Sequence, residues 1–422
     1  MKEDECVSLV VLKFGGTSVG NVEKIRSVAD KIIEEKRKGN QLIIVVSAMG
    51  KTTDQLVALA DEVTDNPNKR EMDMLLSTGE QVTISLLSMA LREKGHEAVS
   101  FTGWQAGIIT EQLHSNARIT GVESEKIEKK LREGKIVIVA GFQGMTTEGE
   151  ITTLGRGGSD TSAVALAAAL QAEKCVICTD VPGIFTSDPR YIKEARKLPS
   201  ISYDEMLELA NLGASVLHPR SVELAKNHQI PIEVCSSTEE QAGTRIEEEI
   251  SMEKNLIVRG VAFEEDITRV TIFWDDKKMM SLDTIFTTLA AHYLNVDIIV
   301  QSLTEQNKAN FSFSIKTEDL QEVLHVLEKN KNELGYQKIE YESGLAKVSI
   351  VGSGMISNPG IAAKMFSVLA TNNMQIKMVS TSEIKVSVVI DKENMIEATE
   401  ALHRAFGLHQ LKAEKALLHT QA

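Results

Sequence analysis

Short apolar runs alternate with amphipathic helical patterns over the first 235 residues. Val7–Phe14, Leu42–Val46, Ile136–Ala140 and Cys175–Thr179 are apolar runs of strand length, and a helical pattern over Asn21–Lys38 separates the first two. Continuous apolar strands joined by helices are typical of a parallel sheet buried on both faces. The N-terminal half is therefore predicted to have an α/β fold, a mostly parallel sheet sandwiched by helices.

The first predicted strand runs directly into a glycine-rich segment, Lys13-Phe14-Gly15-Gly16-Thr17-Ser18. Glycine lets backbone N–H groups approach an anion closely, the following helix start adds partial positive charge, and Lys13 adds a mobile cation. The lysine precedes the glycines, unlike in the common nucleotide-binding loop. We predict a phosphate site here; an ordinary strand-to-helix turn is the alternative.

A second glycine-rich segment, Gly155-Arg156-Gly157-Gly158-Ser159-Asp160, precedes an alanine-rich helical stretch, Ser162–Ala172. An arginine between glycines is poorly placed for packing but well placed to bind a carboxylate or a phosphate in a bidentate manner. The segment predicts an anion site at the start of a helix.

Two further segments carry polar groups next to predicted elements. Ser77-Thr78-Gly79-Glu80 predicts a hydroxyl-capped start for a helix over Gly79–Glu93, and Glu80 is either structural or a ligand for a cation. Thr179–Arg190 leaves a strand as a turn-rich loop that could frame a nucleotide, or could be a plain surface loop.

Composition restricts the partners of the chain. With 422 residues, 42% of them hydrophobic and 25% charged, it resembles a folded soluble protein of about two to four domains. A net charge of -14 disfavours nucleic acid and anionic membranes. The sequence shows no apolar run of the about 18 residues that span a bilayer and no signal peptide, so we expect a cytoplasmic protein.

Cys175-Val176-Ile177-Cys178 predicts a buried strand rather than a metal or redox site, and we predict no protein metal site.

The sequence changes character near residue 243. Thr244–Glu249 is rich in glutamate and is interpreted as a connection between domains. Beyond it, Arg269–Phe273 is echoed by Lys347–Val351, and Ser312–Glu318 by Ser387–Glu393. Each copy predicts strand, helix, two strands and helix, which indicates two small α+β modules that pair with each other and form ligand clefts at their junctions.

The polar groups of the first half suit phosphoryl transfer. Lys13 and Arg156 could neutralise phosphate oxygens, and the carboxylates of Glu80 and Asp160 could bind a substrate ammonium. The sequence offers no Ser-His-Asp order and no metal cluster that would indicate another chemistry. A carboxylate nucleophile is already ionised at neutral pH, so an enzyme acting on one needs no general base.

Five motifs in this order are similar to those of the aspartate kinases: Lys13–Ser18, Ser47–Gly50, Leu76–Glu80, Gly155–Thr161 and Thr179–Gly183. The resemblance covers essentially the whole chain and is closest to the monofunctional, lysine-sensitive branch. It implies an amino-acid kinase fold over residues 1–250 and two ferredoxin-like ACT modules over 266–342 and 343–422, with 255–263 adding a strand to the second module.

The resemblance also implies an activity. ATP would phosphorylate the β-carboxylate of L-aspartate to give 4-phospho-L-aspartate, the committed step toward lysine, threonine, methionine and diaminopimelate. Lys13, Arg156 and Asp160 would be catalytic. The ATP site would comprise Lys13, Phe14, Gly15, Gly16, Ser47, Thr179, Asp180, Phe185 and Arg190. The aspartate site would comprise Thr53, Glu80, Arg156, Gly157, Gly158, Ser159 and Asp160, with Glu80 facing the α-ammonium. Mg²⁺ would be held mainly by the phosphates.

Regulation follows from the same resemblance. An amino-acid effector, with L-lysine the best candidate, would bind at an interface between chains through Gln301, Ser380, Thr381, Ser382 and Glu383. A homodimer or a higher oligomer would form through the ACT modules. The first module has Asp275–Ser281 where relatives often have Asp-x-Pro-Gly, so a single effector is favoured over two.

Three positions depart from the commoner family pattern. Pro182, Phe185 and Ser215 stand where many relatives have Asp, Tyr and an ATP-contacting Lys. Two alternatives to aspartate kinase activity stay open. One is another kinase of the same fold, acting on glutamate, acetylglutamate or a nucleotide. The other is a non-catalytic amino-acid sensor.

Overall fold

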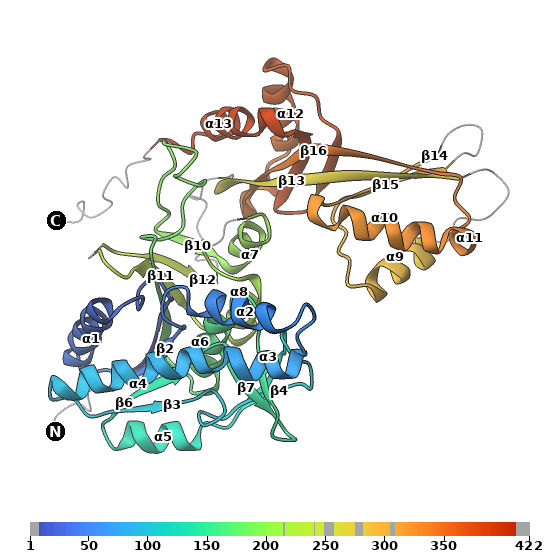
Figure 1. Cartoon of the computed structure of the whole chain (residues 1–422). Coiled ribbons are helices and arrows are strands. Elements are labelled where there is room, and N and C mark those ends of the chain that lie inside the picture. Colours follow the sequence, from blue (N-terminus) through green and yellow to red (C-terminus); the bar gives the residue numbers. More distant parts are fainter. Residues whose placement is uncertain are drawn as a thin grey trace, which may run out of the picture. The chain divides into compact units, whose positions relative to one another are not determined.

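The computed structural model describes residues 8–213, 216–239, 241–248, 257–274, 282–303 and 309–410 (Figure 1). These residues form two compact units. The first holds residues 8–184, 197–211, 216–239 and 241–248. The second holds 185–196, 212–213 and the described residues from 257 onward, so a short internal segment of the N-terminal half belongs to the C-terminal unit.

An eight-stranded sheet forms the centre of the first unit, with the order β10-β12-β11-β9-β1-β2-β6-β3. All adjacent strands are parallel except β11 and β12. The mostly parallel sheet expected from the apolar runs is thereby confirmed. The strands are β1 (Leu9–Phe14), β2 (Gln41–Val46), β3 (Ala98–Phe101), β6 (Ile136–Ala140), β9 (Lys174–Thr179), β10 (Ser200–Ser202), β11 (Ile232–Ser236) and β12 (Thr244–Glu247).

A four-stranded sheet, ordered β5-β4-β7-β8, accompanies the large one. Its strands are β4 (Ile108–Thr110), β5 (Ile119–Val122), β7 (Gln143–Thr146) and β8 (Ile151–Thr153). The helices of this unit are α1 (Val22–Arg37), α2 (Thr52–Val63), α3 (Lys69–Leu76), α4 (Thr78–Glu93), α5 (Glu125–Arg132), α6 (Gly158–Ala169), α7 (Tyr203–Asn211) and α8 (Pro219–His228).

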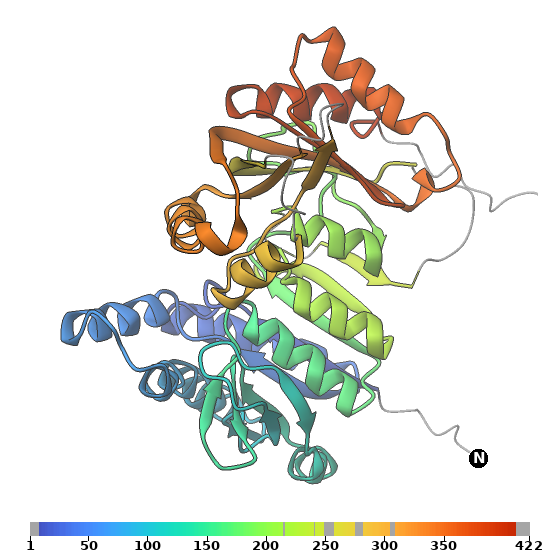
Figure 2. The same cartoon turned by 90° about the vertical axis from the view of Figure 1, so that its right-hand side faces the viewer.

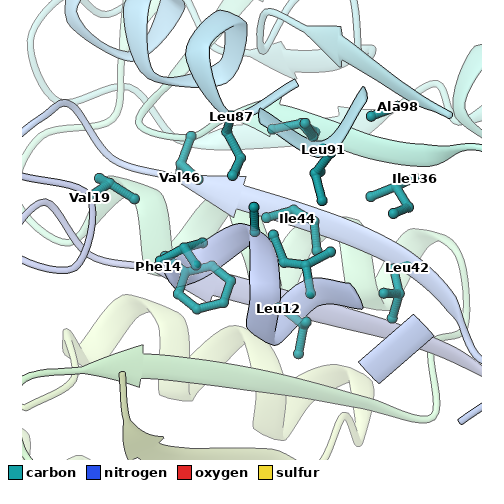
Figure 3. Close-up of a cluster of buried hydrophobic side chains, with 14 of the residues drawn as sticks. Leu12, Phe14, Val19, Leu42, Ile44, Val46, Leu87, Leu91, Ala98 and Ile136 are labelled. Atoms are coloured by element: carbon teal, nitrogen blue, oxygen red, sulfur yellow. The ribbon is translucent and has the colours of Figure 1, made fainter. Parts of the chain in front are cut away.

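Both faces of the large sheet are covered by helices. Alternate residues of β1 and β2 pack with α1 and α4 in one core, which Figure 3 shows around Leu12, Phe14 and Ile44. α6 lies against β1, β2 and β9 and contacts α8, which in turn contacts α7 (Figure 2). Cys175 and Cys178 are buried in β9, which confirms the prediction of a buried strand for that segment.

Three local expectations were wrong. Thr244–Glu247 is not a connection but strand β12, because Thr244 and Ile246 are fully buried against β10 and β11 and only the intervening side chains face outward. The Ser77 hydroxyl does not cap α4; it donates to the Met74 carbonyl, because helix α3 precedes it directly. The alanine-rich helix begins at Gly158 and ends at Ala169, so Ser159 and Asp160 lie in its first turn.

The stretch Lys69–Glu93, which contains α3 and α4, is long and apolar enough to cross a membrane by length and composition alone. Half of its apolar window, 50%, is buried inside the protein. Asp73 and Glu80 are buried on it with polar partners. Burial of this kind is typical of the core helix of a folded domain.

A six-stranded sheet, ordered β14-β15-β13-β16-β18-β17, forms the second unit, and all its pairs are antiparallel. The strands are β13 (Gly260–Phe273), β14 (Ile299–Leu303), β15 (Ala309–Lys316), β16 (Lys338–Val351), β17 (Met378–Thr381) and β18 (Lys385–Asp391). The α-helices are α9 (Leu282–Ala291), α10 (Leu320–Lys329), α11 (Lys331–Leu334), α12 (Ile361–Thr371) and α13 (Met395–Ala405), with single 3₁₀ turns at Thr317–Asp319, Ser353–Met355 and Lys392–Asn394.

The order of elements repeats within this unit. β13, α9, β14, β15 and α10 are followed by β16, α12, β17, β18 and α13, which confirms the duplicated pattern of strand, helix, two strands and helix. Gly260–Glu264 of β13 pair with Lys347–Val351 of β16, while Ile267–Phe273 pair with both β15 and β16. One long strand therefore serves both copies.

Candidate active site

The carboxyl ends of β1, β2, β6 and β9 meet at one edge of the parallel sheet. The Gly15 N–H donates to the Cys178 carbonyl at the end of β9, and the Ser47 N–H donates to the Phe14 carbonyl. Gly16 lies so close to the loop after β2 that a Cβ on it would be 2.8 Å from the Ala48 carbonyl oxygen. The turn after β1 therefore requires glycine, and it brings backbone N–H groups to this edge.

Strand alternation decides where Lys13 points. Leu12 and Phe14 face the core under α1 and α4 (Figure 3), so Lys13 faces the opposite side, where α6 packs on β1. There the Lys13 Nζ lies 2.6 Å from Asp160 Oδ1, and each side chain is 11% exposed. The cation of the first glycine-rich loop and the carboxylate of the second thus form a nearly buried ion pair.

A second contact joins the start of α6 to the loop after β2. Ser47 Oγ, after β2, lies 2.8 Å from Ser159 Oγ in the first turn of α6. Ser159 also packs closely against Gly141, after β6, since a Cβ on Gly141 would be 2.8 Å from the Ser159 Cβ. The start of α6, the positive end of the helix dipole, is therefore held over the ends of three strands.

Glu80 is 2% exposed at the start of α4. Its Oε1 accepts a hydrogen bond from the Ala48 N–H at 3.1 Å, and its Oε2 accepts one from Gln143 Nε2 at 3.5 Å. Burial raises the pKa of Glu80 from 4.5 to about 7, although both hydrogen bonds oppose the shift. A cationic partner would strongly stabilise the ionised form of a carboxyl group buried in this way.

Arg156 is exposed at the tip of a tight turn in which the Gly158 N–H donates to the Gly155 carbonyl at 3.0 Å. Both flanking glycines have left-handed backbone, with φ of 73° at Gly155 and 67° at Gly157. A Cβ on Gly157 would lie 2.1 Å from the Cβ of His218. The turn therefore holds the backbone of Arg156 in place while its side chain projects freely.

The remaining predicted nucleotide residues fall into two groups. Thr179 ends β9 and Asp180 follows it in the first unit, with Thr179 Oγ1 donating to Asp180 Oδ1 at 3.1 Å. Phe185 and Arg190 belong to the second unit, where Arg190 forms a bidentate pair with Asp188. Thr53, predicted for the aspartate side, lies half-buried in the first turn of α2.

The segment with Phe185 and Arg190 is held by contacts inside the second unit. Thr186 Oγ1 lies 2.9 Å from Nε2 of the buried His403 on α13, and the Thr186 carbonyl accepts from the Val261 N–H at 2.8 Å. Burial lowers the pKa of His403 to about 4, so its ring is neutral at pH 7. Arg404 pairs with Glu194 at 2.8 Å.

The predicted effector residues lie at the two edges of the six-stranded sheet and in one turn. Gln301 is exposed on edge strand β14, Ser380 and Thr381 are on edge strand β17, and Ser382 and Glu383 follow in the turn to β18. Ser215 and the segment Asp275–Ser281, on which two expectations rest, lie outside the described residues.

Sequence reasoning missed several polar residues around these loops. Asp73 is fully buried and accepts hydrogen bonds from Thr153 Oγ1 at 2.6 Å and from the Ser115 N–H at 3.0 Å. Gln143 and Arg220 also bind backbone carbonyls beside the site. Isolated polar residues carry no pattern in the sequence, so no signal there could have identified them.

The described residues offer a partner-less hydroxyl to an anion but no cluster of metal-ligating side chains. Within the described residues, no group of three or more His, Cys, Asp or Glu could hold a metal ion. The Ser18 hydroxyl, in the glycine-rich loop, is buried and has no hydrogen-bond partner among the described residues. A phosphate oxygen beside this loop would supply one, so the residues present fit a nucleotide phosphate.

Comparison with known proteins agrees with this geometry. Residues 8–236 match the amino acid kinase family, and residues 348–406 match the ACT domain. The chain is 68% identical to the aspartokinase of Bacillus sp. (strain MGA3) and 66% identical to aspartokinase 2 of Bacillus subtilis (strain 168), each over 95% of this chain and 98% of the relative.

A solved structure extends the similarity to three dimensions. E. coli aspartokinase III, solved in complex with aspartate and ADP, has a TM-score of 0.79 at 27% identity over 94% of this chain and 99% of that one. The same enzyme solved with lysine and aspartate gives a TM-score of 0.73. The identity to the Bacillus proteins over nearly their full length is decisive, and the chain belongs to the aspartokinase family.

Proposed function

We propose that this chain transfers the γ-phosphoryl group of ATP to the β-carboxylate of L-aspartate and that L-lysine inhibits it by feedback. Aspartate kinase activity comes with membership of the family. The observation that carries the assignment of the site is the 2.6 Å ion pair between Lys13 and Asp160, because it joins the two glycine-rich loops in one place.

Phosphoryl transfer depends on positioning and on neutralising charge on the transferring oxygens. Lys13, together with the glycines Gly15 and Gly16, would hold the transferring phosphoryl group. Asp160 would keep the Lys13 ammonium on the α6 side of the sheet until ATP binds. The attacking β-carboxylate is ionised at neutral pH, so the chain needs no general base.

The aspartate site would be built around Glu80 and Arg156. The Glu80 carboxylate would bind the α-ammonium, because a buried carboxylate whose pKa is near 7 is stabilised by a cation. The exposed Arg156 guanidinium would bind a substrate carboxylate in a bidentate manner. Thr53, Gly157, Gly158 and Ser159 would complete the site.

The nucleotide would extend from the phosphate loops past Thr179 and Asp180, with Ser47, Phe14, Phe185 and Arg190 also assigned to it. Pro182 and Phe185 carry no side-chain hydroxyl or carboxylate, so they would contact the nucleotide only through apolar surface. Mg²⁺ bound to the phosphates would supply a further positive charge on the transferring oxygens. A solved relative holds ADP, which supports ATP as the co-substrate.

A hydroxamate-trapping assay with aspartate, glutamate and acetylglutamate tests the substrate. We expect product with aspartate alone. Turnover with glutamate or acetylglutamate instead of aspartate would show that the chain is a kinase for that other substrate. Lys13→Ala in the same assay addresses the sensor alternative. We expect the variant to lose activity but to remain folded, as a cooperative melting transition would show. Unchanged ATP turnover would remove the proposed role of Lys13.

L-Lysine is proposed as the effector because a related aspartokinase has been solved with lysine bound. Its site would use Gln301, Ser380, Thr381, Ser382 and Glu383. Lysine would weaken catalysis by favouring a chain arrangement that opens the kinase region. Initial rates with and without lysine test this: inhibition is expected, and unchanged rates at several millimolar lysine would remove the regulatory proposal and leave the kinase proposal standing.

We also propose that the protein is a cytoplasmic homodimer or higher oligomer joined through its ACT region. Both edge strands of the six-stranded sheet expose apolar side chains: Ile299 and Val300 on β14 are 48% and 39% exposed, and Val379 on β17 is 40% exposed. Open edges of this kind favour pairing with another strand. Light scattering after gel filtration should give at least twice the mass of the chain, and a monomer would contradict the proposal.

A further inference from the structure

Arg220, in the first turn of α8, donates three hydrogen bonds to the base of the Arg156 turn. Its Nη1 donates to the Leu154 carbonyl at 2.6 Å and to Asn116 Oδ1 at 3.1 Å, and its Nη2 donates to the Ala117 carbonyl at 2.8 Å. Leu154 and Ala117 are both fully buried. A single guanidinium therefore ties together the two chain segments that lie beneath Arg156.

The side-chain partner of Arg220 reaches the turn directly. A Cβ on Gly155 would lie 2.8 Å from Asn116 Oδ1, the atom to which Arg220 donates. On the other side of the turn, Gly157 packs against His218, two residues before Arg220. Gly155 thus rests on a group that the Arg220 side chain holds, while Gly157 rests on His218, whose Nδ1 accepts the Arg220 backbone N–H at 3.3 Å.

The scaffold under Arg220 is itself rigid. Ser115 has left-handed backbone, with φ of 71°, and Asp73 holds it by accepting its N–H with both carboxylate oxygens. The Ala117 N–H donates to the Thr153 carbonyl at 2.9 Å, and the Thr153 hydroxyl donates to Asp73. Residues 115–117 therefore form a fixed platform, to which Arg220 fastens the strand-to-helix loop.

We infer that Arg220 is a positioning residue for aspartate, acting through Arg156 rather than on the substrate itself. The inference rests on the proposed role of Arg156. A long, flexible arginine binds a carboxylate well only when its backbone is fixed, because a displacement of about 1 Å can cost as much as about a hundredfold in rate. Arg220 supplies that restraint at the Leu154 carbonyl, two residues before Arg156.

The test compares steady-state constants of four proteins: wild type, Arg220→Ala, Arg220→Lys and Arg118→Ala. Arg118 is exposed and lies near enough to repel Arg220, so Arg118→Ala removes a charge from the same region while leaving the three hydrogen bonds intact. We expect Arg220→Ala to raise the KM for aspartate by about tenfold to a hundredfold and to change the KM for ATP by less than about twofold. Arg220→Lys should fall between, and Arg118→Ala should match wild type.

A double-variant cycle with Arg156→Ala separates this inference from the proposed function. If Arg220 acts through Arg156, adding Arg220→Ala to Arg156→Ala should raise the KM for aspartate no further. Additive effects, equal increases in both KM values, or an effect of Arg118→Ala as large as that of Arg220→Ala would overturn the inference. If Arg156→Ala alone left the KM for aspartate unchanged, the proposed role of Arg156 would fail first. Should Arg220→Ala be insoluble, Arg220→Lys provides the same comparison.

Discussion

The buried carboxylate of Glu80 makes aspartate binding pH-dependent. With a pKa of about 7 in the free protein, about nine-tenths of Glu80 is protonated at pH 6 and about nine-tenths is ionised at pH 8. The substrate ammonium requires the ionised form, and aspartate itself does not titrate between these pH values. We therefore expect kcat/KM for aspartate to be about tenfold lower at pH 6 than at pH 8.

The assay measures kcat/KM for aspartate from pH 5.5 to 8.5 at saturating MgATP. Glu80→Gln keeps an acceptor for the Ala48 N–H but cannot ionise, so it should raise the KM for aspartate by about a hundredfold and remove the pH dependence. Glu93→Gln, an exposed change on the same helix, should keep the wild-type profile. A wild-type profile that is flat across pH 7, or a Glu80→Gln variant with normal affinity, would refute the reasoning.

The pH dependence of protein stability gives an independent test of the raised pKa of Glu80. Folding raises the pKa of Glu80 from 4.5 to about 7, so the folded protein binds the proton more tightly than the unfolded chain. The stability contributed by this protonated carboxyl is present below pH 4.5 and is lost as the pH rises through 7. The loss amounts to about 3 kcal/mol and should be absent in Glu80→Gln, as urea unfolding at several pH values would show.

Three further predictions concern the loops and the second unit. Gly157→Ala places a methyl group 2.1 Å from the His218 Cβ at a φ of 67°. The control Gly134→Ala has a similar φ of 78° but open space, and should cost about 1–2 kcal/mol of stability. We expect Gly157→Ala to cost more than this control, and equal urea midpoints would contradict the expectation. Asp73→Ala leaves Thr153 Oγ1 and the Ser115 N–H without their acceptor, so the free energy of unfolding in urea should fall by about 3 kcal/mol or more. The exposed control Asp54→Ala should lose almost none. Similar losses in both variants would count against the role of Asp73. Thr186→Val removes the hydroxyl that meets His403 Nε2 and accepts the Arg196 N–H, and should cost about 1–3 kcal/mol of stability, a prediction that an unchanged unfolding curve would rule out.

The sequence by itself determined the parallel sheet, the duplicated C-terminal pattern and the loops after β1 and before α6. Each depends on short-range features: apolar periodicity, glycines that permit a close approach, and the fixed side-chain alternation of a strand. Thr244–Glu247 was misread because its alternation spans only four residues and runs directly into three consecutive glutamates, Glu247–Glu249.

Only the tertiary structure decided which of these polar groups meet. The Lys13–Asp160 pair, the burial that raises the pKa of Glu80, the grouping of Phe185–Arg196 with the second unit, and the three hydrogen bonds of Arg220 all join residues far apart in the chain. The physical reason is that desolvation and hydrogen bonding depend on the surroundings of a group in space. A local pattern indicates which residues can do the chemistry, but packing sets their charge state and holds them in place.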